Sequence, residues 1–149
     1  MRYYISVPMA IIAFSCVVTH SQEAAPIRDG RIQAAVSAIV AVQFGDGESA
    51  AISALQACYQ SLPQGKNTER LEECLSQDIA YANLSAGMYA KVLKNMKQPE
   101  YASIDAMKVR VFNEARRAGH SQVEAGELLR GIAPLAIQSI GPAIQARQK

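Results

Sequence analysis

Cys58 and Cys74 have the spacing to form a disulfide between neighbouring helices. They flank residues 62–67, where a proline and a glycine make a continuous helix unfavourable. Each cysteine lies on an apolar stripe with helical spacing, so two helices folded back at this break would bring the sulfur atoms together. Neither cysteine belongs to a Cys-x-x-Cys pair, which disfavours a redox-active site. We therefore predict a structural disulfide that staples a helical hairpin.

Other residue types that perform chemistry give little support for catalysis. Apart from His20, His120 is the only histidine, and it lies between Gly119 and Ser121 in an expected turn. No Gly-x-Ser-x-Gly motif and no Cys-x-x-Cys-His haem motif occurs in the sequence. An enzyme would need a cleft that joins His120 to the acidic residues near Glu69. We expect neither an enzyme nor a bound cofactor.

A metal site is also not expected. Met88, Met96 and Met107 carry thioethers that copper accepts, but they lie apart on or beside apolar stripes, which favours packing. Asp46 and Glu48 stand among glycines like a fragment of a calcium loop, yet the other acidic ligands of such a loop are missing. A turn and a helix cap explain these two residues more simply.

Basic residues gather around the end of the longest expected helix and the start of the next. A cluster there could contact an anionic ligand or an acidic partner surface, although cations are also expected in the last turn of any helix. A solvated face is the alternative interpretation. The candidate contact residues are Lys91, Lys94, Lys97, Tyr101 and Lys108.

The first 21 residues have the pattern of a cleaved signal peptide. Arg2 precedes an apolar run from Ile5 to Val18, and Thr19 and Ser21 are small residues at positions −3 and −1 of a cut after Ser21. The run is shorter than the roughly 20 residues of a membrane span. An uncleaved anchor and lipidation at Cys16 are the alternatives. We expect residues 22–149 to be periplasmic or secreted, which suits a disulfide.

Charge excludes one class of partner. Without Arg2 the chain keeps 14 of its 15 basic residues against 13 acidic ones, which is close to neutral. Nucleic-acid-binding domains usually carry a larger basic excess. We expect no nucleic-acid partner, and contact with a membrane only through the signal peptide.

The elements that would position these residues are helices. Half of the residues are apolar, tryptophan is absent, and runs typical of strands are missing beyond the N-terminus. The sequence predicts an all-α single-domain bundle of about five helices. The first helix is apolar nearly all round and is expected to be the most buried one. Residues 22–29 are expected to form a loose arm and residues 145–149 a frayed tail. The predicted helices span residues 29–44, 46–62, 67–97, 103–119 and 121–140, with caps at Asp46 or Ser49, Asn67 or Thr68, Ser103 and Ser121.

Local signals refine two of these helices. Gly87 lies inside the third helix, where it favours a close helix crossing. Pro134 is expected to bend or interrupt the fifth helix, and Gly141-Pro142 to end it. The stretch from Leu128 to Ile144 is strongly apolar. It is expected to cover the core, and the alternative is an exposed patch for a partner, for a lipid or for self-association.

The hypothesis that the sequence favours is a binding protein, such as an accessory, inhibitor or immunity factor with an unknown protein partner. The alternative is a carrier of a small apolar or anionic ligand. Its pocket would be lined by Val36, Val40, Leu75 and Leu129, and would enclose several hundred cubic ångströms.

Overall fold

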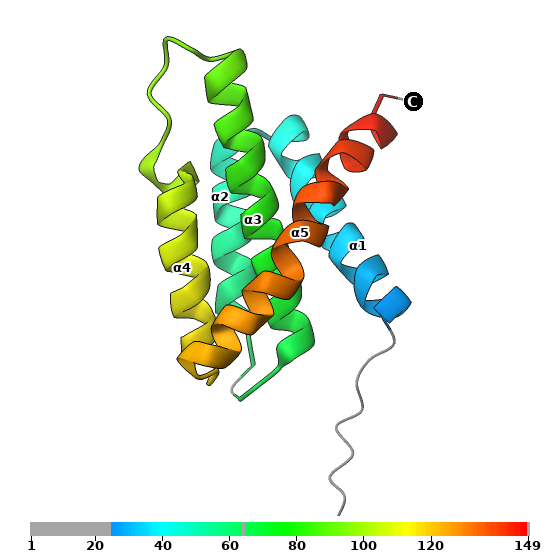
Figure 1. Cartoon of the computed structure of the whole chain (residues 1–149). Coiled ribbons are helices and arrows are strands. Elements are labelled where there is room, and N and C mark those ends of the chain that lie inside the picture. Colours follow the sequence, from blue (N-terminus) through cyan, green and yellow to red (C-terminus); the bar gives the residue numbers. More distant parts are fainter. Residues whose placement is uncertain (1–24, 64, 149) are drawn as a thin grey trace, which may run out of the picture.

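The computed structural model describes residues 25–63 and 65–148, all of them in helices or connecting turns. The expected signal peptide, residues 1–21, lies outside the described residues. The predicted all-α bundle of five helices is confirmed (Figure 1). The helices are α1 (Ala25–Gly45), α2 (Glu48–Gln60), α3 (Thr68–Lys91), α4 (Ile104–Arg117) and α5 (Gln122–Ala146), with a short 3-10 helix η1 (Glu100–Ala102) before α4.

The central helix is α3, which packs against each of the other four α-helices. The expectation that α1 would be the most buried helix is wrong. Ala34 and Ala38 face solvent, and α1 buries a single stripe that includes Ile32, Val36 and Val40. Alanine has little apolar surface to remove from water, so an alanine-rich face can remain exposed at small cost. Figure 1 shows α2, α3 and α4 side by side, with α5 crossing them obliquely toward α1.

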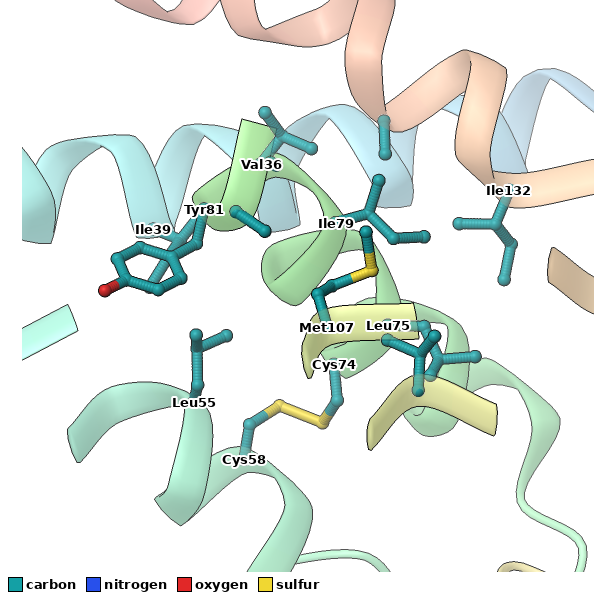
Figure 2. Close-up of a cluster of buried hydrophobic side chains, with 14 of the residues drawn as sticks. Val36, Ile39, Leu55, Cys58, Cys74, Leu75, Ile79, Tyr81, Met107 and Ile132 are labelled. Carbon is teal, nitrogen blue, oxygen red and sulfur yellow. A yellow bond between two sulfur atoms is a disulfide. The ribbon is translucent and has the colours of Figure 1, made fainter. Parts of the chain in front are cut away.

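The disulfide joins α2 to α3 within the core. Cys58 and Cys74 have Cα atoms 5.6 Å apart and a sulfur–sulfur bond of 2.00 Å, and both residues are buried. Figure 2 shows the bond beside a cluster that includes Leu55 of α2 and Leu75 of α3. The predicted stapled hairpin is confirmed.

Three of the expected helix caps are confirmed. The Asn67 side chain accepts a hydrogen bond from the backbone N–H of Arg70 at 2.9 Å, and Ser103 caps α4 in the same way. Ser121 and Glu124 form a reciprocal capping box, with donor–acceptor distances of 2.7 and 3.2 Å. These caps fix where α3, α4 and α5 begin.

The start of α2 differs from the prediction. Its N-cap is Gly47, with a φ of 88° and no side-chain cap, so neither Asp46 nor Ser49 has the expected role. A left-handed φ favours glycine, and the tight turn between α1 and α2 requires it here. The carboxylate of Glu48 instead accepts hydrogen bonds from Tyr81, Ser85 and Tyr89.

The ends of three helices also differ. Helix α1 begins at Ala25, so residues 25–29 are not a loose arm, and Pro26 lies in the first turn, where its missing N–H leaves no bond unmade. Helix α3 ends at Lys91 rather than near residue 97. Helix α5 continues through Pro134 and Pro142 to Ala146, so residues 145–146 are helical. Each proline removes one backbone hydrogen bond, but packing of the apolar face keeps α5 helical.

Two further packing expectations are wrong. Gly87 is exposed, and a methyl group added there would meet no atom within 4 Å, so no helix crosses closely at this glycine. Met107 lies in the core and Met88 packs against it, but Met96 is 61% exposed.

Among the described residues, no helix is long and apolar enough to cross a membrane.

Candidate binding groove

An apolar groove lies between α3, α4 and α5 and encloses about 640 Å³. We call it the α4–α5 groove. In Figure 1, α4 and α5 are joined at one end and diverge along their length. The turn that joins them contains Gly119, with a φ of 92°, and ends at the Ser121 cap. The groove is lined by Ile79, Asn83, Ile104, Met107, Lys108, Val109, Val111, Phe112, Asn113, Leu129, Ala133 and Ile137.

The floor of the groove belongs to the core, and its rims are open. Ile79 and Val111 are each 2% exposed, whereas Val109 is 63% and Ile137 is 46% exposed. On α5 the lining residues recur every four positions, at Leu129, Ala133 and Ile137, so they form one stripe along the helix. This stripe lies within the apolar stretch from Leu128 to Ile144. The adjacent face of that stretch packs in the core through Ile132, Ala136 and Ala143.

Few polar groups reach the groove, and most of them already have partners. The Asn83 amide donates to the carbonyl oxygen of Ile79 at 2.7 Å, and Lys108 lies 3.3 Å from Asp105. Asn113 lies at the rim, where it also borders a neighbouring hollow. A surface of this kind can bind an apolar group by removing it from water, but it offers no acid–base pair.

A buried ion pair between α3 and α4 lies beside the groove. The Asp78 carboxylate is fully buried and accepts hydrogen bonds from Tyr59 at 2.9 Å and from Arg110 at 2.8 and 2.5 Å. The guanidinium of Arg110 also lies 3.7 Å from the centre of the Tyr101 ring. Burial raises the pKa of Asp78, and Arg110 opposes that rise. Burial, together with the Asp78 charge, raises the pKa of Tyr59.

A buried carboxylate with a shifted pKa is a common mark of an active site, so its partners matter. The two oxygens of Asp78 are occupied by Arg110 and Tyr59, and Arg117 in turn bonds the Tyr59 carbonyl oxygen at 2.8 Å. These contacts join α2, α3 and α4. We interpret the network as a structural connection between the three helices.

The acidic residues at the start of α3 are engaged in ion pairs. Glu72 is buried and pairs with Arg28 and Arg31, each at 2.7 Å. Glu73 pairs with Arg70 at 2.6 Å. The Nε2 atom of His120 is buried and has no hydrogen-bond partner among the described residues. The pairing of His120 with a carboxylate that the enzyme hypothesis requires is therefore not found there.

The basic residues singled out in the sequence separate into two places. Lys91 ends α3, and Lys94 and Lys97 follow it in the connection to η1, all three exposed. Tyr101 instead stacks on Arg110, and Lys108 lies on α4 at the groove. An anion contact at the lysines stays a prediction, but Tyr101 is engaged elsewhere.

The α4–α5 groove differs from the ligand pocket expected from the sequence. Val36, Val40 and Leu75 are fully buried in the core, and of the four residues predicted to line a pocket only Leu129 does so. Two sequence signals point to the groove that forms: the apolar stretch of α5, and Val109, an apolar residue on the polar side of α4. Neither shows that α4 and α5 diverge.

Comparisons of this chain with protein-family models, curated proteins and solved structures find no match.

Proposed function

We propose that the protein is an exported binding protein that holds an apolar ligand in the α4–α5 groove. The observation that carries the proposal is the groove itself, an apolar hollow of about 640 Å³ with a buried floor. Ligand pockets typically enclose roughly 300 to 1,000 Å³ and are lined mainly by apolar side chains, with a few polar groups. The α4–α5 groove has this size and lining. Export is part of the proposal and is supported by the buried Cys58–Cys74 disulfide, which is typical of oxidising compartments.

A competition experiment tests the site. An apolar fluorescent probe, N-phenylnaphthylamine, would be titrated into the protein, followed by fatty acids and fatty alcohols as competitors. The variant Ala133→Phe places a large side chain in the groove wall and is expected to weaken probe binding at least tenfold. Ala38→Phe is the matched control, because Ala38 is an exposed alanine on α1, away from the groove. Equal binding by both variants would contradict the proposal.

A second candidate function is the binding of a partner protein's helix in the same groove. The exposure of Val109 and Ile137 favours it, because an open rim leaves much of a small molecule in water. A photo-cross-linking amino acid at Val109 should then give one product of defined mass. The same amino acid at Val123 is the control, because Val123 is 68% exposed but does not line the groove. Native mass spectrometry of the purified protein distinguishes the two functions, since only a carrier retains a small molecule.

A further inference from the structure

The connection between α3 and η1 combines exposed apolar side chains with lysines. We call residues 91–97 the lysine loop; they have the sequence Lys-Val-Leu-Lys-Asn-Met-Lys. Of the seven large apolar side chains that are exposed in the described part of the chain, two lie here: Val92, 76% exposed, and Met96, 61% exposed. Lys91, Lys94 and Lys97 are exposed beside them. Neither apolar side chain contributes to the core.

The lysine loop has defined backbone structure. The N–H groups of Val92 and Leu93 both donate to the carbonyl oxygen of Met88, at 2.8 and 2.9 Å, and the N–H of Met96 donates to Leu93 at 2.9 Å. In Figure 1 the connection from α3 to η1 extends beyond the ends of the neighbouring helices at that end of the bundle. The loop can therefore meet a flat surface before the other described residues do.

The charges within the lysine loop are all positive. The sequence contains no acidic residue between Asp78 and Glu100. Glu48 approaches this end of α3, but its carboxylate already accepts hydrogen bonds from three hydroxyl groups, including that of Tyr89 at 2.8 Å. Asp46 is the other acid in the neighbouring turn between α1 and α2. The loop itself carries three positive charges and no negative one.

From this arrangement we propose that the lysine loop docks on an anionic lipid surface, with Val92 and Met96 inserted at the level of the headgroups. Lysines near an anionic bilayer are attracted to its surface potential, and apolar side chains gain by leaving water at the interface. A neutral bilayer would offer only the burial of the apolar side chains, without the attraction of the lysines. This contact is separate from the α4–α5 groove, and from the membrane contact expected of residues 1–21.

Because the chain contains no tryptophan, a single tryptophan can report insertion locally. The full-length, oxidised variant Val92→Trp would be mixed with vesicles of phosphatidylcholine, with and without phosphatidylglycerol. With phosphatidylglycerol, we expect a blue shift of the indole emission and quenching by brominated lipid. Val123→Trp is the matched control, because Val123 is exposed to a similar extent (68% against 76%) at the start of α5. If the protein bound vesicles only through its N-terminal residues, Val92→Trp and Val123→Trp would give the same indole response.

Charge variants test the other half of the proposal. In the Val92→Trp background, Lys91→Gln/Lys94→Gln/Lys97→Gln should lower the affinity for anionic vesicles, measured by titrating the indole emission, by about 100-fold. This corresponds to roughly a factor of five per lysine. The control Arg116→Gln/Arg130→Gln/Arg147→Gln removes the same charge from exposed residues elsewhere and should change this affinity less than threefold. Raising the salt concentration should weaken the binding of the Val92→Trp protein to anionic vesicles.

Three outcomes would overturn the proposal. The first is an equal response to neutral and anionic vesicles. The second is an equal loss in the lysine and arginine variants, which would indicate attraction by net charge alone. The third is the absence of a blue shift and of quenching in Val92→Trp with anionic vesicles, as expected if the lysines instead serve an acidic protein partner.

Discussion

Removing Arg110 should destabilise the fold far more than removing any exposed cation of α4. The variant Arg110→Met keeps much of the length of the side chain but leaves the fully buried carboxylate of Asp78 without its counter-charge. Tyr59 remains as a hydrogen-bond donor at 2.9 Å. One hydroxyl group cannot replace two charge-assisted bonds from a guanidinium.

The expected loss is about 3–5 kcal/mol in the free energy of unfolding, the usual range when one partner of a buried ion pair is removed. For a domain of this size that is a large fraction of the total, which is typically about 5–15 kcal/mol. Lys108→Met is the control on the same helix. Its pair with Asp105 spans 3.3 Å between side chains that are 67% and 94% exposed, so its loss should cost less than about 1 kcal/mol.

The pH dependence gives the prediction a sign. Burial already raises the pKa of Asp78 from its ordinary value of 3.8, and Arg110 is the main group that lowers it. Without Arg110 the pKa should rise further, so the folded state of the variant binds a proton more tightly than the unfolded state. The stability of Arg110→Met should therefore increase as the pH falls through the raised pKa, relative to the parent, and the gain should be complete below the ordinary value.

Urea unfolding followed by circular dichroism, with the disulfide intact, measures these differences. Adding Asp78→Asn to Arg110→Met removes the buried charge and should restore part of the loss, together with the excess pH dependence. A loss of under 1 kcal/mol in Arg110→Met, or no recovery in the double variant, would falsify the view that Asp78 is charged and compensated in the fold.

Four further predictions concern the disulfide, α3 and the start of α5. Replacing both Cys58 and Cys74 by alanine should lower the free energy of unfolding by about 3 kcal/mol, since the disulfide closes a loop between residues 16 apart. A loss below about 1 kcal/mol in urea unfolding would contradict this. Gly87→Ala should raise stability by about 0.5–1 kcal/mol, because the position is helical and open, and destabilisation would show that the space is not free. Ser121→Ala should lower stability by about 0.5–2 kcal/mol through loss of the cap, measured by urea unfolding. Hydrogen bonds from the backbone and side chains lower the pKa of Glu124 to about 2, from 4.5. The contribution of the Glu124 carboxylate to the stability of the fold is therefore present above its ordinary pKa and lost as the pH falls through about 2. Glu124→Gln should remove this part of the pH dependence of stability.

Local sequence patterns were sufficient for the features that depend on neighbouring residues. The break at residues 62–67, the cap at Asn67 and the capping box at Ser121 each involve groups within a few positions of one another. The Cys58–Cys74 pair followed from the same local information, because two helical stripes and one short turn place the two residues opposite each other. Signals of this kind can be identified without knowledge of the rest of the chain.

Features that depend on packing were predicted poorly. Two prolines suggested that α5 would bend or break at Pro134 and end at Gly141-Pro142, but the helix continues because its buried residues, such as Ile132 and Ala136, hold it against α1 and α3. Alanine content suggested that α1 would be central, yet burial depends on the neighbours that a helix has, and α3 has the most. Periodicity describes one helix at a time, whereas packing is a property of pairs.

The sequence by itself determined an all-helical chain with one stapled hairpin, and it identified the lysines and the apolar stretch of α5 as unusual. Only the tertiary structure decided that Asp78 and Arg110, 32 residues apart, form a buried pair. It also decided that α4 and α5 diverge to leave an apolar groove. The physical reason is that crossing angles and long-range ion pairs arise from the simultaneous fit of several helices, and that fit leaves no signature at fixed spacing along the chain.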